Sequence, residues 1–171
     1  MNAGETKNTV KSTNKRHKHL NIMIVEDDKY MNEALCYVLE SEGYNVDSST
    51  DAPNAVDMLK NTGKNYDLLI VDYNLQHFGG MTGLDVYEIA KNVNPASKGV
   101  MISAYGRNKN LREKALEKGI AVFLDKPFLI SELIDSVEGL RGENEVKNRS
   151  KGKLKENLKD NSDSRTQFNH I

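Results

Sequence analysis

The sequence predicts an α/β fold in which a doubly wound parallel sheet of five strands is covered by five helices. Short, continuous apolar runs alternate along residues 21–140 with longer segments in which apolar residues recur at helical spacing. Strands buried on both faces of a parallel sheet have such continuous apolar runs. The repeated strand–helix order is typical of a parallel sheet with helices on both of its faces.

Four apolar runs predict buried strands, and a fifth run predicts a weaker one. The four are NIMIV at residues 21–25, LLIV at 68–71, GVMIS at 99–103 and VFL at 122–124. The weaker candidate is YNVDSS at residues 44–49, which has fewer apolar residues.

Each predicted strand is followed by a predicted helix. Gly43 and Gly119 stand where glycine commonly ends a helix, and Pro53 suits a first helical turn. The five predicted helices span Tyr30–Glu42, Ala52–Asn61, Leu84–Asn92, Asn110–Lys118 and Ser131–Leu140.

Composition divides the 171 residues into one globular domain, residues 21–141, and two polar tails. The tails, residues 1–20 and 142–171, have almost nothing apolar to bury, so we expect both to be disordered. Lys and Arg outnumber acids by five to one in residues 1–20 and by eight to five in residues 141–171, whereas residues 21–140 hold eleven against nineteen. This small basic excess is weak support for nucleic-acid binding, and no nucleic-acid-binding domain is visible.

The cysteine content and the lack of long apolar segments indicate the compartment. Cys36 is the single cysteine and cannot form an internal disulfide, which suits a reducing environment. The first 20 residues lack the apolar run of a signal peptide, and no window approaches the roughly 18 apolar residues of a membrane helix. We therefore expect a cytoplasmic protein with no membrane partner.

Charged and hydroxyl side chains follow the predicted strands at their carboxyl ends. These residues are Glu26 and Asp27 after the first strand, Asp72 after the third, Ser103 at the end of the fourth and Lys126 after the fifth. Because ligands of doubly wound sheets bind beyond the carboxyl ends of the strands, we expect these side chains to share one crevice. A carboxylate there, such as Asp72, costs desolvation energy unless a cation or a lysine pairs with it.

This set of side chains suits phosphoryl transfer. Carboxylate oxygens with open water positions are the ligands that Mg²⁺ prefers, and one Mg²⁺ together with Lys126 would neutralise the three acids. Asp72 would then be a carboxylate nucleophile that forms an acyl phosphate. Lys126 and the Ser103 hydroxyl would hold the phosphoryl oxygens.

Four sequence blocks resemble the receiver domain of two-component response regulators. They are IMIVEDD at residues 22–28, LLIVDYNL at 68–75, VMISAY at 100–105 and FLDKPF at 123–128. An acidic doublet alone is common, but four blocks in this order are highly specific. The resemblance covers roughly residues 20–141 and implies the flavodoxin-like receiver fold of stand-alone chemotaxis regulators.

The resemblance implies a role for each acidic residue of the set. Asp72 matches the aspartate that is phosphorylated. Glu26 and Asp27 match the acidic pair, in which Asp27 binds Mg²⁺ directly and Glu26 acts largely through water. Asn74 matches the position whose backbone carbonyl completes the metal shell, and its side chain is expected to modulate dephosphorylation.

The resemblance also implies which residues respond to phosphorylation. Ser103 matches the switch hydroxyl, Phe123 the switch aromatic residue and Lys126 the invariant lysine. The Lys126–Pro127 peptide bond corresponds to one that is usually cis. Tyr105 is a further expected modulator of dephosphorylation, because a bulky ring there would shield an acyl phosphate from water and slow its hydrolysis.

The loop after the third strand departs from the family pattern. The family usually has proline four residues after the phosphorylated aspartate, where this chain has Gln76. The glycine that precedes the third helix is assigned to Gly83, with Gly80 as the alternative, because residues 76–83 contain an insertion. This loop borders the site, so we expect it to affect the choice of partner.

We expect a stand-alone receiver that accepts a phosphoryl group from a sensor histidine kinase or a histidine phosphotransfer protein, with Mg²⁺ bound. It is expected to be a signalling switch that catalyses its own phosphorylation and slow autodephosphorylation, and not a conventional enzyme. A conformational shift on the face of the fourth helix, fifth strand and fifth helix would signal to a downstream protein partner.

Three other interpretations fit parts of the sequence. A docking module that works without phosphorylation usually has a damaged acidic pair, aspartate or lysine, and all of these are intact here. A nucleotide-binding or hydrolytic enzyme would need a phosphate loop, but no Gly-Lys-Ser/Thr follows Gly79 and Gly80. The acids at residues 26–28 could simply cap a helix, a role that we assign to Asp28 alone.

Overall fold

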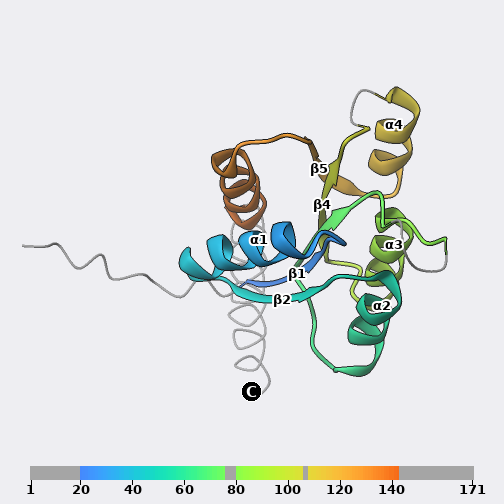
Figure 1. Ribbon diagram of the computed structural model, residues 1–171. Helices are drawn as coiled ribbons and strands as arrows, with labels where there is room; N and C mark the ends of the chain where they lie inside the picture. Colours follow the sequence, from blue (N-terminus) through green and yellow to red (C-terminus); the bar gives the residue numbers. More distant parts are fainter. Residues whose placement is uncertain (1–19, 76–79, 106–107, 143–171) are drawn as a thin grey trace, which may run out of the picture.

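The structure is a computed structural model that describes residues 20–75, 80–105 and 108–142. Five parallel strands form one sheet: β1 (Asn21–Val25), β2 (Asn45–Ser49), β3 (Leu68–Asp72), β4 (Lys98–Ser103) and β5 (Ile120–Asp125). Their order across the sheet is β2-β1-β3-β4-β5 (Figure 1). The predicted fold class and all five predicted strands, including the weaker candidate, are therefore confirmed.

Five helical segments connect or follow the strands. They are α1 (Lys29–Ser41), α2 (Ala52–Asn61), α3 (Gly83–Val93), α4 (Lys109–Glu117) and a last helix over residues 130–142. The ends of α1 to α4 and the start of the last helix lie within one residue of the predicted ones, and Gly43 and Gly119 follow α1 and α4 with φ of 90° and 93°. Of the predicted tails, residues 1–20 and 142–171, only Leu20, which is buried, and Gly142, which is helical, are described; the rest of both tails and Gln76 lie outside the described residues.

Polar side chains fix where four of the helices begin. Asp28, Asp51 and Asn108 accept hydrogen bonds from the backbone N–H groups three residues ahead in α1, α2 and α4. Thr82 and Asp85 form a reciprocal capping box at the start of α3. The predicted cap at Asp28 is thus confirmed, and it places α1 directly after the acids that follow β1.

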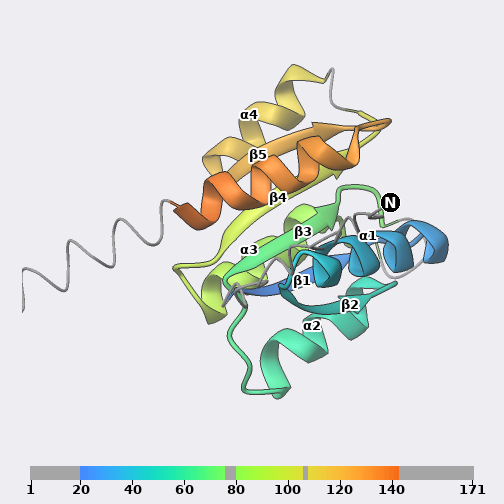
Figure 2. The ribbon, with the colours of Figure 1, turned by 90° about the vertical axis from the view of Figure 1, so that its left-hand side faces the viewer.

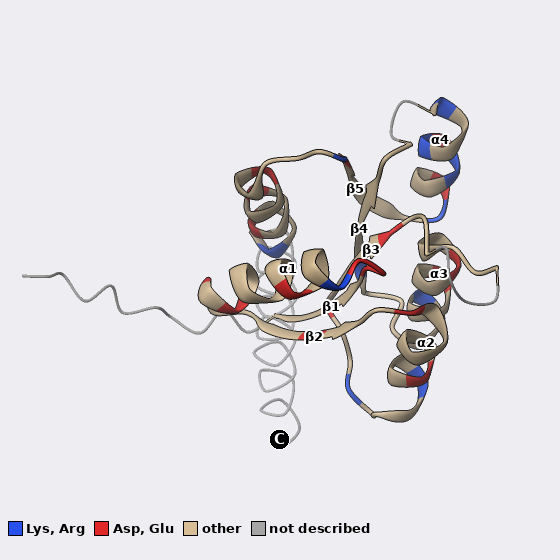
Figure 3. Ribbon diagram, viewed as in Figure 1, with Lys and Arg blue, Asp and Glu red and all other residues tan. Residues whose placement is uncertain are grey.

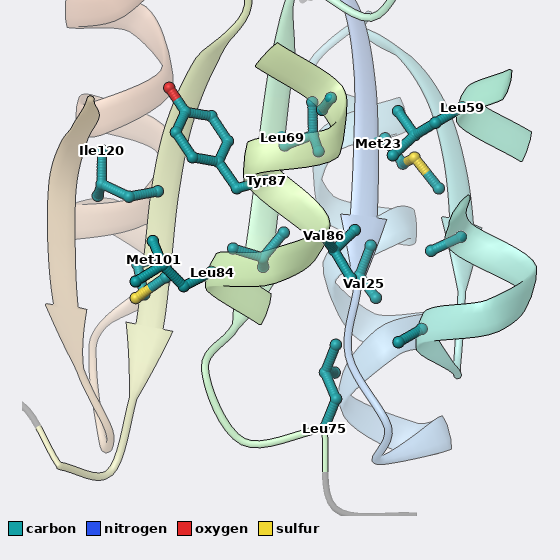
Figure 4. Packing of buried hydrophobic residues seen from close by; sticks show 14 of the residues in the cluster. Met23, Val25, Leu59, Leu69, Leu75, Leu84, Val86, Tyr87, Met101 and Ile120 are labelled. Atoms are coloured by element: carbon teal, nitrogen blue, oxygen red, sulfur yellow. The ribbon is translucent and has the colours of Figure 1, made fainter. Parts of the chain in front are cut away.

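Alternate residues of the strands pack on opposite faces of the sheet. On β1, Met23 and Val25 belong to the core under α2, α3 and α4, whereas Ile22 and Ile24 belong to the core under α1 and the last helix. Figure 4 shows the first of these cores, and Figure 2 shows α1 and the last helix together on the other face. Burial on both faces explains why these strands are continuously apolar.

The connections after β1 and β3 diverge at the centre of the sheet. The chain goes from β1 to β2 on one side, and from β3 to β4 on the other. In doubly wound sheets, ligands bind beyond the carboxyl ends of the strands at such a point. The fold therefore predicts a ligand site at the residues that follow β1 and β3.

No helix in the described part of the chain has the length and apolar character needed to cross a membrane.

Candidate functional site

Three acidic side chains converge at the carboxyl ends of β1 and β3. The two strands are paired, with Val25 opposite Val71, so Glu26 and Asp27 lie beside Asp72. One carboxylate oxygen from each of the three acids lies within 4.8 Å of the others. Figure 3 shows the acidic segments meeting at these strand ends.

Lys126 binds two of the three acids. Its Nζ lies 2.7 Å from Oδ2 of Asp72, and 2.8 Å and 3.0 Å from the two carboxylate oxygens of Glu26. The Glu26 and Asp72 side chains are only 1% and 8% exposed, and that of Lys126 is 24% exposed. Nearly buried carboxylates need such a partner, which explains how an acid can end the fully buried strand β3.

Burial and the neighbouring charges act in opposite directions on the pKa values of Glu26 and Lys126. Burial raises the pKa of Glu26 above its usual value, although the hydrogen bond from Lys126 opposes this rise. Burial by itself would lower the pKa of Lys126, but its hydrogen bonds to Asp72 and Glu26 raise that pKa above the usual value. Lys126 is therefore a permanent positive charge beside Asp72 at neutral pH.

The backbone around Asp72 is held on both sides. The Asn74 N–H donates to Oδ1 of Asp72 at 3.2 Å, and the Tyr73 N–H donates to the Ile102 carbonyl at 2.9 Å. The Gly83 N–H donates to the Tyr73 carbonyl at 3.0 Å. These hydrogen bonds link Asp72 and the start of the loop that follows it to β4 and to the first residue of α3.

Gly83 is the glycine that the Asp72 backbone requires. A Cβ atom at Gly83 would lie 2.0 Å from the Asp72 carbonyl oxygen, whereas a Cβ at Gly80 would have no heavy atom within 4 Å. The start of α3 therefore approaches Asp72 too closely for any side chain. This contact favours Gly83 over Gly80 as the glycine that precedes the third helix.

Ser103 lies beside the acids, at the end of β4. It is fully buried, and its Oγ accepts a hydrogen bond from the Tyr105 N–H at 2.9 Å. Its carbonyl accepts the Lys126 N–H at 2.9 Å, and the Lys126–Pro127 peptide bond is cis. The Tyr105 side chain is 53% exposed.

Phe123, the predicted switch aromatic residue, is half-buried and packs against the core under α2, α3 and α4. The Arg112 guanidinium of α4 lies 4.7 Å from the centre of its ring. Nη2 of Arg112 also lies 2.8 Å from both carboxylate oxygens of Asp125. Sequence reasoning missed Arg112, because a lysine or arginine on a polar helix is ordinarily solvated and no local pattern marks its partners.

Asn32 is a second residue that sequence reasoning missed. Its side-chain amide is buried and donates to the Glu26 carbonyl at 3.3 Å and to the Ser49 carbonyl at 3.0 Å. It therefore ties the carboxyl ends of β1 and β2 together under the acidic pair. Its helical spacing from Leu35 and Leu39 places it on the buried face of α1 and was a signal that could have revealed it.

Together, these side chains form a site suited to a hard cation and a phosphoryl group. All three acids offer oxygen, the donor type that Mg²⁺ prefers, and the chemistry of this donor set fits that ion. Beside them stand a lysine that is permanently charged and a buried hydroxyl.

Comparison with known proteins agrees with this geometry. The family model of the response regulator receiver domain matches residues 22–138. The response regulator RppA of Synechocystis is 34% identical over 122 residues, 71% of this chain and 50% of RppA. The chemotaxis protein CheY of Treponema pallidum is 32% identical over 108 residues, 62% of this chain and 72% of CheY. The chain therefore spans about half the length of RppA but most of CheY.

Solved structures share the same architecture. A CheY-like receiver domain from Methanospirillum hungatei superimposes with a TM-score of 0.67 at 23% identity, over 75% of this chain and 98% of its own. The CheX–CheY–BeF₃–Mg²⁺ complex from Borrelia burgdorferi matches with a TM-score of 0.62 at 27% identity, over 71% and 88% of the two chains.

Proposed function

The chain belongs to the family of response regulator receiver domains, and from this premise we propose that Asp72 accepts a phosphoryl group from phosphohistidine. The donor is a sensor histidine kinase or a histidine phosphotransfer protein. The observation that carries this proposal is the buried Asp72 carboxylate, 2.7 Å from Lys126 Nζ and within 4.8 Å of two further acids.

In the proposed reaction, an oxygen of ionised Asp72 bonds to phosphorus as the phosphorus–nitrogen bond of phosphohistidine breaks. The electron pair of that bond stays on the imidazole, which leaves neutral if it was protonated beforehand. Lys126 stabilises the negative charge of the phosphoryl oxygens as they enter the site. The Ser103 hydroxyl is the residue proposed to bind one of these oxygens after transfer.

Carboxylates of Glu26, Asp27 and Asp72 would hold Mg²⁺, with the Asn74 backbone carbonyl as a further ligand. When bound, the ion would stabilise the negative charge of the phosphoryl oxygens and offset the mutual repulsion of the acids. We propose Asn74 and Tyr105 as the residues that set how fast the acyl phosphate is hydrolysed. Slow hydrolysis of this kind makes the protein a timed switch and not a turnover enzyme.

The proposed output is a shift in the population of two conformations of α4, β5 and the last helix. Ser103 and Phe123 are the residues proposed to bias it, because they lie on β4 and β5 beside the site. A downstream protein partner would recognise this face. A docking module that works without phosphorylation is the second candidate, and the intact acids and lysine count against it.

The test is the intact mass of the protein after incubation with acetyl phosphate, with and without Mg²⁺. We expect wild type to gain one phosphoryl group only with Mg²⁺, and Asp72→Ala to gain none. Asp51→Asn is the matched control, since it removes an acid after the neighbouring strand β2 but keeps a capping side chain. If wild type gains no mass from acetyl phosphate or from a phosphorylated histidine kinase, the docking module is the correct interpretation.

A further inference from the structure

Arg112 joins α4 to β5 through two side chains that flank the site. Resting on the proposed function, we propose that Arg112 is a positioning residue. It clamps α4 and Phe123 in place while Asp72 is unmodified, and phosphorylation must displace it. Nζ of Lys126 lies 2.7 Å from Oδ2 of Asp72, a contact that a phosphoryl group on Asp72 would replace. In this proposal, the clamp belongs to the conformation that has this contact.

The clamp consists of two contacts made by one guanidinium group. Its Cζ atom lies 4.7 Å from the centre of the Phe123 ring, a distance at which a cation attracts an aromatic face. Its Nη2 lies 2.8 Å from both carboxylate oxygens of Asp125. Phe123 and Asp125 are two residues apart on β5, so their side chains leave the same face of the strand and one arginine can reach both.

α4 buries few of its own residues. The helix has nine residues and buries only Leu111 and Ala115, whereas α3 buries five of its residues. Figure 1 shows α4 at the outer side of the sheet beside β5, which is an edge strand. Arg112 adds a polar contact to β5 to this small apolar area, and the Lys118–Glu88 ion pair joins the other end of the helix to α3.

The residues held by Arg112 are directly connected to the proposed site. Asp125 pairs with Ser103 across β4 and β5, and the next residue, Lys126, donates its N–H to the Ser103 carbonyl at 2.9 Å. Phe123 pairs with Met101 on the same two strands. Lys126 thus directly follows the strand that carries both side chains held by Arg112, and Ser103 pairs with that strand from β4.

Thermodynamic linkage makes this coupling measurable. If the clamp stabilises only the unphosphorylated conformation, weakening it reduces the free-energy difference that an acyl phosphate must overcome. A ligand that binds the other conformation then binds more tightly by the same factor. For a cation–π contact at an exposed site this factor is about two- to five-fold.

Three variants isolate the clamp. Arg112→Met keeps an apolar stem over Phe123 but removes the guanidinium, and Asp125→Asn removes the charge of its partner. Lys109→Met is the matched control, because it removes one positive charge from the exposed start of the same helix. The double variant Arg112→Met/Asp125→Asn tests whether the two residues act as one unit.

Two measurements are made on each full-length variant. The first is amide hydrogen exchange over residues 108–118 without ligand. We expect it to be about two- to five-fold faster in Arg112→Met, as for a lost exposed cation–π contact, and up to about five-fold faster in Asp125→Asn, as for a lost surface ion pair. The second is the apparent affinity for beryllofluoride with Mg²⁺, a mimic of the acyl phosphate, monitored by the NMR signals of the Phe123 ring. We expect tighter binding by a similar factor, no further gain in the double variant and no change in Lys109→Met.

Each result decides a separate claim. Unchanged exchange of the α4 amides in Arg112→Met overturns the clamp. Faster exchange with unchanged beryllofluoride affinity overturns the link between the clamp and the switch. If wild type binds no beryllofluoride, the proposed function fails, while the exchange rates still show whether Arg112 holds α4.

Discussion

Lys126 determines the electrostatics of the site at the scale of single residues. Its ammonium group is the cation that the described residues bring into contact with Glu26 and Asp72, both nearly buried. The proximity of Lys126 to Glu26 and Asp72 could be predicted from the sequence, because each of these residues lies at or just after the carboxyl end of a strand in the same sheet. The sequence could not reveal Arg112, whose partners lie on another element and depend on side-chain orientation. For Asn32 it offered only the helical spacing that places this residue on the buried face of α1.

Replacing Lys126 tests this electrostatic role. In Lys126→Met, two nearly buried carboxylates lose their positive partner, so we expect the free energy of unfolding to fall by about 3 kcal/mol without Mg²⁺. Mg²⁺ should restore part of the loss, because it supplies positive charge to the same acids. Urea unfolding with EDTA and with Mg²⁺ measures both effects. Lys29→Met, at an exposed side chain, is the control, and an equal loss in both variants would contradict the prediction.

At the scale of secondary-structure elements, the burial of each strand determined how clearly that strand could be predicted from the sequence. The strands β1 and β3 are covered on both faces and gave clear apolar runs, whereas the edge strand β2 is mostly half-exposed and gave a weak one. Asp47, in the middle of β2, accepts a hydrogen bond from the Tyr66 hydroxyl at 2.7 Å and pairs with Lys64. That long-range network explains a polar strand that propensity alone would not favour.

The capping box of α3 makes the stability of this element depend on pH. Burial raises the pKa of Asp85, but hydrogen bonds from Thr82 and the charges of Lys114 and Lys118 outweigh burial and hold that pKa below its ordinary value of 3.8. A carboxyl with a lowered pKa stabilises the fold above its ordinary pKa and loses this effect as pH falls through the folded value. The capping contribution should therefore be complete at neutral pH and disappear in acid.

Asp85→Ala should lower the free energy of unfolding at pH 7 by about 1 kcal/mol, the usual contribution of a capping side chain. The difference from wild type should shrink as pH falls from 3.8 through the lower pKa of the folded state, below which Asp85 is protonated in both states. Urea titrations across this pH range measure it. Thr82→Ser keeps the capping hydroxyl and should follow wild type, whereas a difference that is constant with pH would show that Asp85 acts through packing alone.

At the scale of the whole molecule, the site joins distant parts of one cooperative fold. Its groups come from the ends of β1, β3 and β5, and the two cores on either side of the sheet hold these strands in register. A unit of this size ordinarily unfolds in one transition. A ligand that binds only the folded site therefore stabilises the entire domain.

Mg²⁺ should consequently raise the free energy of unfolding of the whole protein. At a free concentration 100 times its dissociation constant, the gain is about 2.7 kcal/mol for an ion that binds only the folded state. Asp27→Asn should lose most of this dependence, because the variant removes one of the three carboxylates that meet there. Asp51→Asn should retain it, since Asp51 caps α2 and is not one of those three acids. Thermal unfolding monitored by circular dichroism over a series of Mg²⁺ concentrations measures the gain, and equal slopes in wild type and Asp27→Asn would place the ion elsewhere.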